Sequence, residues 1–312
     1  MKALIIGGAG FVGKYLTRRL LEDKYEVVVT KMENEAIDAE GFEVADLDIL
    51  DYLSVKALLE SGTFSCIFHL AAQSSVALSW KNPQLTVDVN IKGALNVLDA
   101  MRETEYKGKA VLIGSGEEYG TIDVREVPIA EKTVLRPGNI YAATKGCQNM
   151  LGTIYAKAYG LDIVLVRAFN HIGPGQSEVF VVSDFCKQIV EIEKGLREPI
   201  LRVGNLEAKR DFTDVRDVVR AYEYLGRMGK AGETYNVGSG KAISIREILD
   251  AIIRLSGADV EVVVDENKLR PVDVPVIEAD IGKISSMTGW KPEYDLETTI
   301  TDTIKYWRKL YE

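Results

Sequence analysis

The 312-residue sequence has little of what marks a metalloprotein, a membrane protein or a nucleic-acid-binding protein. It contains only two histidines, His69 and His171, and its three cysteines lie far apart, so neither set has the spacing of a metal site. No apolar run approaches the roughly 20 residues that cross a bilayer. A net charge of −9 argues against a broad basic surface for nucleic acid. We therefore expect no metal, no membrane contact and no nucleic-acid partner.

The scattered cysteines also indicate a cellular compartment. Without a paired spacing they are expected to be free thiols, as in a reducing cytoplasm. The chain starts directly with an apolar, β-rich segment rather than with a leader, so we expect a cytoplasmic location. An apolar content of 46% and a charged content of 27% are ordinary for a globular protein of one large domain or two unequal ones.

The first fifteen residues combine a short apolar run, a glycine cluster and a helical pattern. Residues 3–6 have the composition of a strand buried on both faces. Gly7, Gly10 and Gly13 follow, and an amphipathic helical pattern begins at Phe11. Glycine tolerates positive φ and lets a pyrophosphate approach the backbone, while a helix N-terminus favours an anion. This order predicts a dinucleotide-binding site, with an ordinary glycine turn as the alternative.

The type of dinucleotide depends on the end of the second expected strand. A carboxylate normally stands there and holds the adenosine ribose, but here the strand ends in Thr30-Lys31. Lys31 can pair with a 2′-phosphate, so NADP(H) is favoured and NAD(H) stays possible; a solvated loop lysine is the alternative. Asp46, at the end of the third strand, can accept a hydrogen bond from the adenine amino group. Alternatively, Asp46 or Asp48 caps the next helix.

Strand and helix patterns alternate with short links through the first half of the chain. We therefore expect an α/β fold with a Rossmann-type, doubly wound parallel sheet. Residues 1–165 are expected to form the dinucleotide-binding domain, with some later segments returning to it. Residues 166–312, where the alternation becomes irregular, are expected to form mainly a smaller α/β region for substrate binding. Such a region would lie over the carboxyl edge of the sheet, where ligands bind.

Three residues in two segments suggest proton transfer. Tyr141 and Lys145 are four residues apart on an expected helix, so they lie on one face. A neighbouring ammonium stabilises a phenolate and lowers the pKa of the phenol toward neutrality. Ser115, at the end of the expected strand 110–113, can hydrogen-bond a substrate oxygen beside the phenol. The set suits proton exchange with an alcohol or ketone during hydride transfer, although a Tyr–Lys pair at this spacing also arises by chance.

Together these features resemble the extended short-chain dehydrogenase/reductase family, over nearly the whole chain. Further segments share the resemblance: 69–72 (HLAA), Asn90, 167–170 (RAFN), 210–217 (RDFTDVRD) and 235–240 (YNVGSG). The resemblance implies that Tyr141 is the general acid/base, that Lys145 lowers its pKa and holds the nicotinamide ribose, and that Ser115 steadies the reacting oxygen.

The resemblance also implies the residues that contact the ligands. The expected cofactor contacts are Gly7, Gly10, Phe11, Val12, Gly13, Thr30, Lys31, Asp46, Leu47, Leu70, Ala71, Ala72, Asn90, Tyr141 and Lys145. The expected substrate contacts are Gln73, Ser74, Ser115, Asn170, Lys187, Arg202, Arg210, Arg270 and Asp273. Basic residues concentrate in the C-terminal part of this otherwise acidic chain, which supports a site for a nucleotide diphosphate. The residues assigned to it are Lys187, Arg210 and Arg270. Surface ion pairing is an equal alternative for Arg202.

Within the family, four segments most resemble the GDP-4-keto-6-deoxy-mannose reductases and the neighbouring GDP-mannose 4,6-dehydratases: 71–76, 117–120, 169–176 and 270–273. Ser115 followed by Glu117-Glu118 is typical of the reductases, while Gly116 departs from their pattern. Glu117 matches the position of the dehydratase base.

We therefore expect NADP(H)-dependent reduction of the 4-keto group of a GDP-4-keto-6-deoxyhexose, of the type that converts GDP-4-keto-6-deoxy-D-mannose to GDP-D-rhamnose. A GDP-mannose 4,6-dehydratase that uses Glu117 as its base is the first alternative, and a UDP-hexose 4-epimerase is the second. A catalytically silent nucleotide-binding regulator on the same fold is a third. The sequence does not fix the nucleotide base, so a UDP-sugar is possible.

The helices expected near 83–102 and 141–158 each carry a wide apolar face. In the family that the sequence resembles, the matching helices of two copies pair in a four-helix interface. We therefore expect a homodimer, and a monomer whose helices pack internally is the alternative.

Overall fold

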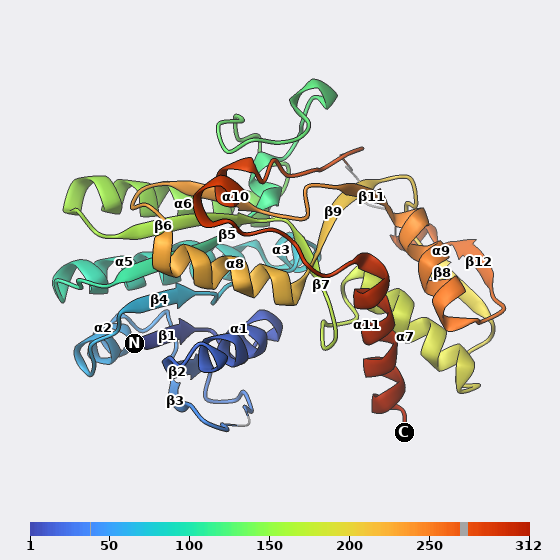
Figure 1. Ribbon diagram of the computed structural model, residues 1–312, viewed down its shortest axis with the longest axis horizontal. Helices are drawn as coiled ribbons and strands as arrows, with labels where there is room; N and C mark the ends of the chain where they lie inside the picture. Colours follow the sequence, from blue (N-terminus) through green and yellow to red (C-terminus); the bar gives the residue numbers. More distant parts are fainter. Residues whose placement is uncertain (38, 269–273) are drawn as a thin grey trace.

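The computed structural model describes residues 1–37, 39–268 and 274–312. Its centre is a seven-stranded sheet in the order β10-β6-β5-β4-β1-β2-β3, with every neighbouring pair parallel (Figure 1). The strands are β1 (Lys2–Ile6), β2 (Glu26–Lys31), β3 (Glu43–Asp46), β4 (Cys66–His69), β5 (Lys109–Ser115), β6 (Ile163–Ala168) and β10 (Thr234–Val237). The expected Rossmann-type parallel sheet is confirmed.

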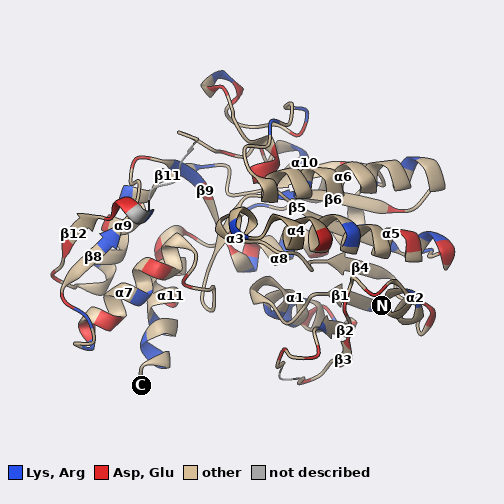
Figure 2. Cartoon of the chain, turned by 180° about the vertical axis from the view of Figure 1, so that it is seen from behind, with Lys and Arg blue, Asp and Glu red and all other residues tan. Residues whose placement is uncertain are grey.

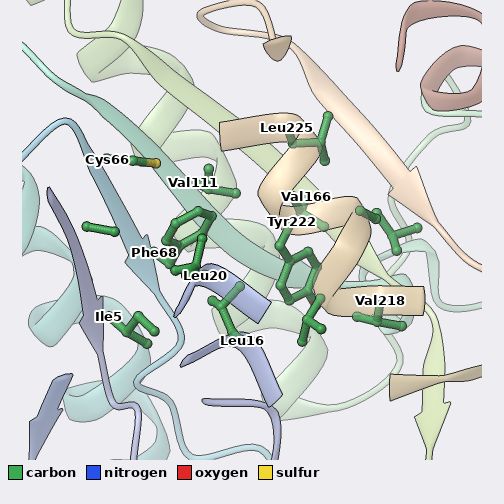
Figure 3. Close-up of a cluster of buried hydrophobic side chains, with 14 of the residues drawn as sticks. Ile5, Leu16, Leu20, Cys66, Phe68, Val111, Val166, Val218, Tyr222 and Leu225 are labelled. Atoms are coloured by element: carbon green, nitrogen blue, oxygen red, sulfur yellow. The ribbon is translucent and has the colours of Figure 1, made fainter. Parts of the chain in front are cut away.

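Helices cover both faces of the sheet because successive strand residues point to opposite sides. Ile5 packs with α1 (Phe11–Glu22) and α8 (Val215–Met228) in the cluster that Figure 3 shows, together with Phe68 and Tyr222. The neighbouring Leu4 packs on the other face with α2 (Tyr52–Glu60) and α5 (Ala94–Glu103). α6 (Ile140–Tyr159) contributes to the same face, while α10 (Gly282–Thr288) packs beside α8 and β10.

The segment between β4 and β5 differs from the single helix expected at 83–102. It contains α3 (Val76–Lys81), α4 (Pro83–Val87), a π-helical turn η1 (Asp88–Gly93) and then α5. Asn82 ends α3 and caps α4 by accepting a hydrogen bond from Leu85 N. The wider π-helical turn places Asn90 inside the protein. The described residues also form three short 3₁₀ turns: η2 (Gly116–Tyr119), η3 (Val124–Glu126) and η4 (Glu266–Lys268).

The second part of the chain forms a smaller α/β region beside the carboxyl edge of the sheet (Figure 1). A three-stranded sheet of β11 (Ala242–Ser244), β9 (Lys209–Asp214) and β7 (Asn170–Ile172) connects it to the main body. Its outer part contains α7 (Val181–Glu193), β8 (Ile200–Val203), α9 (Ile245–Ser256), β12 (Glu261–Val264) and α11 (Leu296–Leu310). Phe185, Ile248 and Ile304 belong to a hydrophobic cluster that is separate from the two beside the large sheet.

Charged residues of both signs lie along the outer helices of this region (Figure 2). Several form ion pairs, such as Arg308 with Glu193 at 2.7 Å and Arg254 with Glu297 at 2.6 Å. In the described parts of the chain, no helix is both long and apolar enough to cross a bilayer.

Candidate active site

The predicted site residues gather where strands β1, β4 and β5 end. Because these strands are parallel neighbours, their carboxyl ends meet at one edge of the sheet. The glycine loop follows β1, residues 70–73 follow β4, and the turn η2 follows β5. The N-terminus of α6 joins them, since α6 packs on both η1 and η2.

The glycines of the loop have different roles. Gly7 has φ +81°, and a Cβ there would lie 2.7 Å from Ala71 Cα, while a Cβ on Gly13 would lie 2.3 Å from Gly8 O. These two glycines therefore allow close packing within the protein. A Cβ on Gly10 would meet nothing nearer than Gly7 O at 3.8 Å. Gly10 is the N-cap of α1, and no side chain of the described residues caps that helix.

The open space at Gly10 fits a dinucleotide. A helix N-terminus with free N–H groups favours a phosphate, and a missing side chain lets the phosphate come close. Thr30 supports the loop instead of pointing outward, because its Oγ1 accepts a hydrogen bond from Gly7 N at 3.0 Å. The N–H groups of Phe11 and Val12, in the first turn of α1, are the groups that would hold the pyrophosphate.

Lys31 and Asp46, both predicted to contact the adenosine half of the cofactor, contact each other. Lys31 Nζ lies 2.6 Å from Asp46 Oδ1 and also donates to Met32 O at 3.2 Å. Neither Asp46 nor Asp48 caps the next helix, as the alternative interpretation had it. The N-cap of α2 is Asp51, whose carboxylate accepts from Leu53 N at 3.1 Å. Asp51 immediately precedes the first turn of α2, whereas Asp46 and Asp48 come earlier in the chain.

The predicted cofactor contacts also include Leu47, Leu70, Ala71 and Ala72. Leu47 lies in the core, and its N–H donates to Lys31 O at 2.8 Å. Leu70 and Ala71 follow β4, and both donate their backbone N–H to Ile6 O at 2.9 Å. This arrangement holds the segment after β4 against the glycine loop, as the steric contact between Gly7 and Ala71 also shows.

Asn90 joins the segment after β4 to α6. Its Oδ1 accepts from Gln73 N at 2.8 Å, and its Nδ2 donates to Gln73 O and Thr144 Oγ1, both at 3.0 Å. The Gln73 side chain is also used within the protein, since its Nε2 donates to Thr86 Oγ1 and its Oε1 accepts from Ser75 N. Ser74, predicted with Gln73 for the substrate, is exposed.

The structure brings Ser115 and Tyr141 together. Burial raises the pKa of Tyr141 to about 12, and the hydrogen bond with the Ser115 side chain only partly opposes this. The charges of Glu117 and Glu118 raise the Tyr141 pKa further. The sequence predicted a lowered value, which is wrong for this structure because burial outweighs the favourable interactions.

Lys145 is buried one helical turn from Tyr141. Its Nζ donates to Gln148 Oε1 at 2.8 Å. Burial lowers the pKa of Lys145 to about 8, and the carboxylate of Glu118 opposes the shift. His69, at the end of β4, is also buried, and burial together with the Lys145 charge lowers its pKa to about 3. His69 is therefore a neutral core residue at the edge of the site.

Glu117 lies beside Ser115 and the start of α6. Its backbone N–H donates to Ser115 Oγ at 3.2 Å, and its Oε2 accepts from Asn139 Nδ2 at 3.2 Å. Asn139 is also the N-cap of α6, accepting from Ala142 N at 2.8 Å. Glu117 is half-buried, and its charge is close enough to raise the Tyr141 pKa. Its position suits a carboxylate that faces a bound ligand.

Glu118 is a residue of the site that the sequence did not identify. It is fully buried and accepts hydrogen bonds from Ser115 N, Asn149 Nδ2 and Arg167 Nε at 2.8, 2.8 and 2.9 Å. In the sequence it is simply the second of two adjacent glutamates. The local signal that could have found it is the spacing Ser115-x-x-Glu118, a capping box in which the Glu118 side chain accepts from the Ser115 backbone N–H.

The other residues predicted to bind the substrate are spread over the second region. Asn170 is exposed on β7, and Arg202 is exposed on β8. Lys187, on α7, pairs with Glu178 at 3.1 Å and lies 5.6 Å from the Trp307 ring centroid. Arg210 is buried and donates to Lys209 O and Val274 O at 2.8 and 2.6 Å. Arg270 and Asp273 lie outside the described residues.

The loop 171–176 contacts α1 and leads into the second region. His171 stacks on Phe11 at 6.2 Å between ring centroids, and Tyr15 Oη donates to Pro174 O at 2.8 Å. Burial lowers the pKa of His171. The N-terminus of α1 is therefore in direct contact with the chain that leads to α7.

The chain has relatives among nucleotide-sugar enzymes. Residues 4–303 match the family model described as GDP-mannose 4,6 dehydratase. The chain is 33% identical to the GDP-6-deoxy-D-mannose reductase of Pseudomonas aeruginosa, over 77% of this chain and 79% of that one. It is 30% identical to GDP-mannose 4,6 dehydratase 1 of Arabidopsis thaliana, over 96% of this chain and 87% of that one.

Solved structures show the same fold. RMD from Pseudomonas aeruginosa complexed with NADPH aligns with a TM-score of 0.86 at 30% identity, over 99% of this chain and all of that one. UDP-glucose 4-epimerase from Thermotoga maritima with UDP-glucose aligns with a TM-score of 0.91 at 28% identity, over the full length of both chains. Reductases, dehydratases and epimerases are thus all among its relatives. The chain belongs to the GDP-mannose 4,6-dehydratase family, within the nucleotide-sugar-modifying short-chain dehydrogenases/reductases.

Proposed function

We propose that the protein is an NADP(H)-dependent reductase of the 4-keto group of a GDP-linked 4-keto-6-deoxyhexose. The product would be a GDP-6-deoxyhexose of the GDP-D-rhamnose type. The observation that carries the proposal is the Ser115–Tyr141 pair, with Lys145 one turn away, at the sheet edge where α1 presents an uncapped N-terminus. The similarity to the Pseudomonas reductase and to the NADPH-bound RMD structure supports the choice within the family.

The protein's own residues supply the proton and the orientation. NADPH, when bound, supplies the hydride that reduces C4. The raised pKa of Tyr141 keeps its hydroxyl protonated at neutral pH, so it can give its proton to the carbonyl oxygen as that oxygen becomes an alcohol. Ser115 Oγ donates a hydrogen bond to the same oxygen. Lys145, buried and cationic below pH 8, stabilises the tyrosinate left behind.

A second candidate is a GDP-mannose 4,6-dehydratase, and Glu117 favours it. A dehydratase must remove a proton next to its transient ketone, which needs a base. Glu117 is a half-buried carboxylate beside Ser115, and the matching family model carries the dehydratase name. A UDP-hexose 4-epimerase is the third candidate. Such an enzyme holds NAD tightly, and a carboxylate at the end of β2 would bind the NAD ribose, but this chain has Lys31 there.

One pair of assays separates these activities. GDP-4-keto-6-deoxy-mannose is supplied with NADPH, and GDP-mannose is incubated in parallel without added cofactor. The reductase consumes one NADPH per keto sugar and leaves GDP-mannose unchanged. A keto product from GDP-mannose without net cofactor use contradicts the reductase and selects the dehydratase. If neither sugar reacts, a third incubation with a UDP-hexose tests the epimerase.

We also propose a homodimer formed by α4, α5 and α6. α4 and α5 each pack against α6, and apolar side chains on α4 and α6 stay exposed. Met150 and Ile154 on α6 are 57% and 55% exposed, and Leu85 and Val87 on α4 are 40% and 42% exposed. A second copy of the same surface would cover them.

A further inference from the structure

The turn after β5 holds the proposed catalytic serine by two hydrogen bonds. Ser115 N donates to Glu118 Oε1 at 2.8 Å, and Ser115 Oγ accepts from Glu117 N at 3.2 Å. The backbone and the side chain of Ser115 are therefore both fixed within one 3₁₀ turn. Of the two glutamates, only Glu118 uses its carboxylate for this, while the Glu117 carboxylate bonds to Asn139.

The protein makes room for the Glu118 carboxylate. A Cβ on Gly114 would lie 2.3 Å from Glu118 Oε1 and also 2.3 Å from Asn149 Nδ2, so only glycine fits there. Asn149, on α6, donates to Glu118 Oε1 at 2.8 Å. The carboxylate thus bridges the end of β5 and the helix that carries Tyr141 and Lys145.

The other oxygen of Glu118 is anchored to the interior of the sheet. Arg167, on β6, donates from Nε to Glu118 Oε2 at 2.9 Å and from Nη1 to Tyr119 Oη at 3.0 Å. Tyr119 Oη in turn donates to Asn236 Oδ1 at 2.7 Å on β10. A buried ion pair contributes little net stability compared with well-packed apolar side chains. Stability alone therefore does not explain why a charge is buried beside Ser115.

We propose that Glu118 is a positioning residue: it fixes the backbone of Ser115 and thereby directs the Ser115 hydroxyl to the reacting substrate oxygen. This role rests on the proposed function in one respect, because the proposed function places Ser115 against the reacting substrate oxygen. Glu118 acts through Ser115 and touches neither substrate nor cofactor. Its negative charge also acts on both Lys145 and Tyr141, which supports its place at the centre of the site.

The test is a double-mutant cycle with Glu118→Gln and Ser115→Ala, measured as kcat for the keto sugar. Glu118→Gln keeps the side-chain size and loses the charge, and we expect kcat to fall roughly 10- to 100-fold, as a slightly misplaced group does. NADPH affinity and the KM for the sugar stay within about twofold. Because Glu118 works through Ser115, the double variant is no slower than Ser115→Ala alone.

Two further variants separate positioning from damage to the fold. Glu131→Gln makes the same change in the same network, where the Glu131 carboxylate accepts from Asn236 N at 3.0 Å, away from Ser115. It is expected to lower the melting temperature with kcat unchanged. Asn149→Ala removes one donor to Glu118 without leaving a charge unpaired, and should lower kcat in the same non-additive way if Glu118→Gln does not fold.

Failure of the positioning role can be told apart from failure of the proposed function. If the wild type reduces the keto sugar and the two substitutions are additive, the positioning role is overturned and the reductase stands. If the wild type acts on GDP-mannose or a UDP-hexose instead, the same cycle is run on that substrate. Independently of turnover, hydrogen exchange at the Ser115 amide should accelerate in Glu118→Gln. Unchanged exchange there overturns the proposal.

Discussion

At the residue scale, the proposed reduction depends most directly on Tyr141. Its raised pKa keeps the phenol protonated, and the proposed reduction uses that proton directly. Tyr141→Phe removes the hydroxyl with little change in shape, so kcat should fall about 10²- to 10⁴-fold while NADPH binds as before. Steady-state kinetics and a fluorescence titration of NADPH measure the two quantities. Full turnover in this variant would show that the Tyr141 hydroxyl does not supply the proton.

Lys145 gives a pH-dependent prediction for stability. Its pKa is about 8 in the folded protein against an ordinary value of 10.5. Below pH 8 the lysine is charged in both the folded and the unfolded protein, and the full cost of burying that charge opposes folding. Between pH 8 and 10.5 the unfolded chain holds the proton more tightly, so stability rises with pH. Lys145→Met should therefore be more stable than the wild type at pH 7, by on the order of 3 kcal/mol.

Denaturant unfolding at pH 7 and pH 10 checks this prediction. The advantage of Lys145→Met should shrink as the pH rises through that range. Lys157→Met, at an exposed position of the same helix, is the matched control and should show no such advantage. A wild type that is more stable than Lys145→Met at pH 7 would mean that the bond from Lys145 to Gln148 outweighs the burial of the charge.

The pair of Lys31 and Asp46 gives a prediction for cofactor choice. If Lys31 binds the 2′-phosphate, it must exchange Asp46 for that phosphate. Asp46→Asn should then tighten NADPH binding, and Lys31→Ala should weaken it, each by about tenfold, with NADH affected little. Titration of both cofactors against each variant measures the difference. Equal weakening of NADPH and NADH by Asp46→Asn would show that Asp46 holds the adenine.

Single residues also show where sequence reasoning reaches its limit. Ser115, Tyr141 and Lys145 were identified because spacing and resemblance are properties of the sequence. The direction of the Tyr141 pKa shift was not, because it depends on how deeply the fold buries the phenol. Glu118 was missed for a related reason. Its partners Asn149 and Arg167 come from distant segments, and only the folded chain brings them to one carboxylate.

At the scale of elements, apolar strands were predictable and polar ones were not. The β1 strand has a continuous apolar run, whereas β9 contains Arg210, Asp211 and Asp214, all of them buried. Asp211 is buried because its carboxylate accepts hydrogen bonds from the backbone of Ser239, Gly240 and Ala279. Such partners are distant in the sequence, so a hydrophobicity pattern does not reveal the strand. The π-helical turn η1 likewise has no pattern of its own.

The glycine loop and α1 together allow a test that separates folding from binding. Gly10→Ala places a methyl group where the protein leaves open space at φ −70°, so the melting temperature should stay within a few degrees of the wild type. The same methyl group lies where a phosphate must approach, so NADPH affinity should fall at least about tenfold. Gly7→Ala, at φ +81° and against Ala71, should instead lower the melting temperature.

Thermal unfolding and NADPH titration of the two variants make the comparison. If Gly10→Ala binds NADPH normally, the cofactor does not lie at the N-terminus of α1. A stable Gly7→Ala would mean that the loop can move away from the segment after β4.

At the scale of the whole molecule, the order of elements explains how the two regions come into contact. The chain leaves the large sheet after β6, returns to it through α8 and β10, and then leaves again. The alternation of patterns predicted the large sheet, which is confirmed. The exact boundary between the two regions stays a prediction, as does the cytoplasmic location. Contacts such as His171 with Phe11 join the regions and depend on the tertiary fold.

The proposed dimer is the prediction that belongs to this scale. Ile154 is 55% exposed on α6, in the apolar surface that a second copy would cover. Ile154→Asp places a charge in that surface, where pairing would bury it without a partner, so the dimer should dissociate into monomers. Val264→Asp, on β12 and also 55% exposed, is the matched control and should remain dimeric. Analytical ultracentrifugation gives the mass of each variant. A monomeric wild type would contradict the dimer, whereas a dimeric Ile154→Asp would place the interface on another surface of the protein.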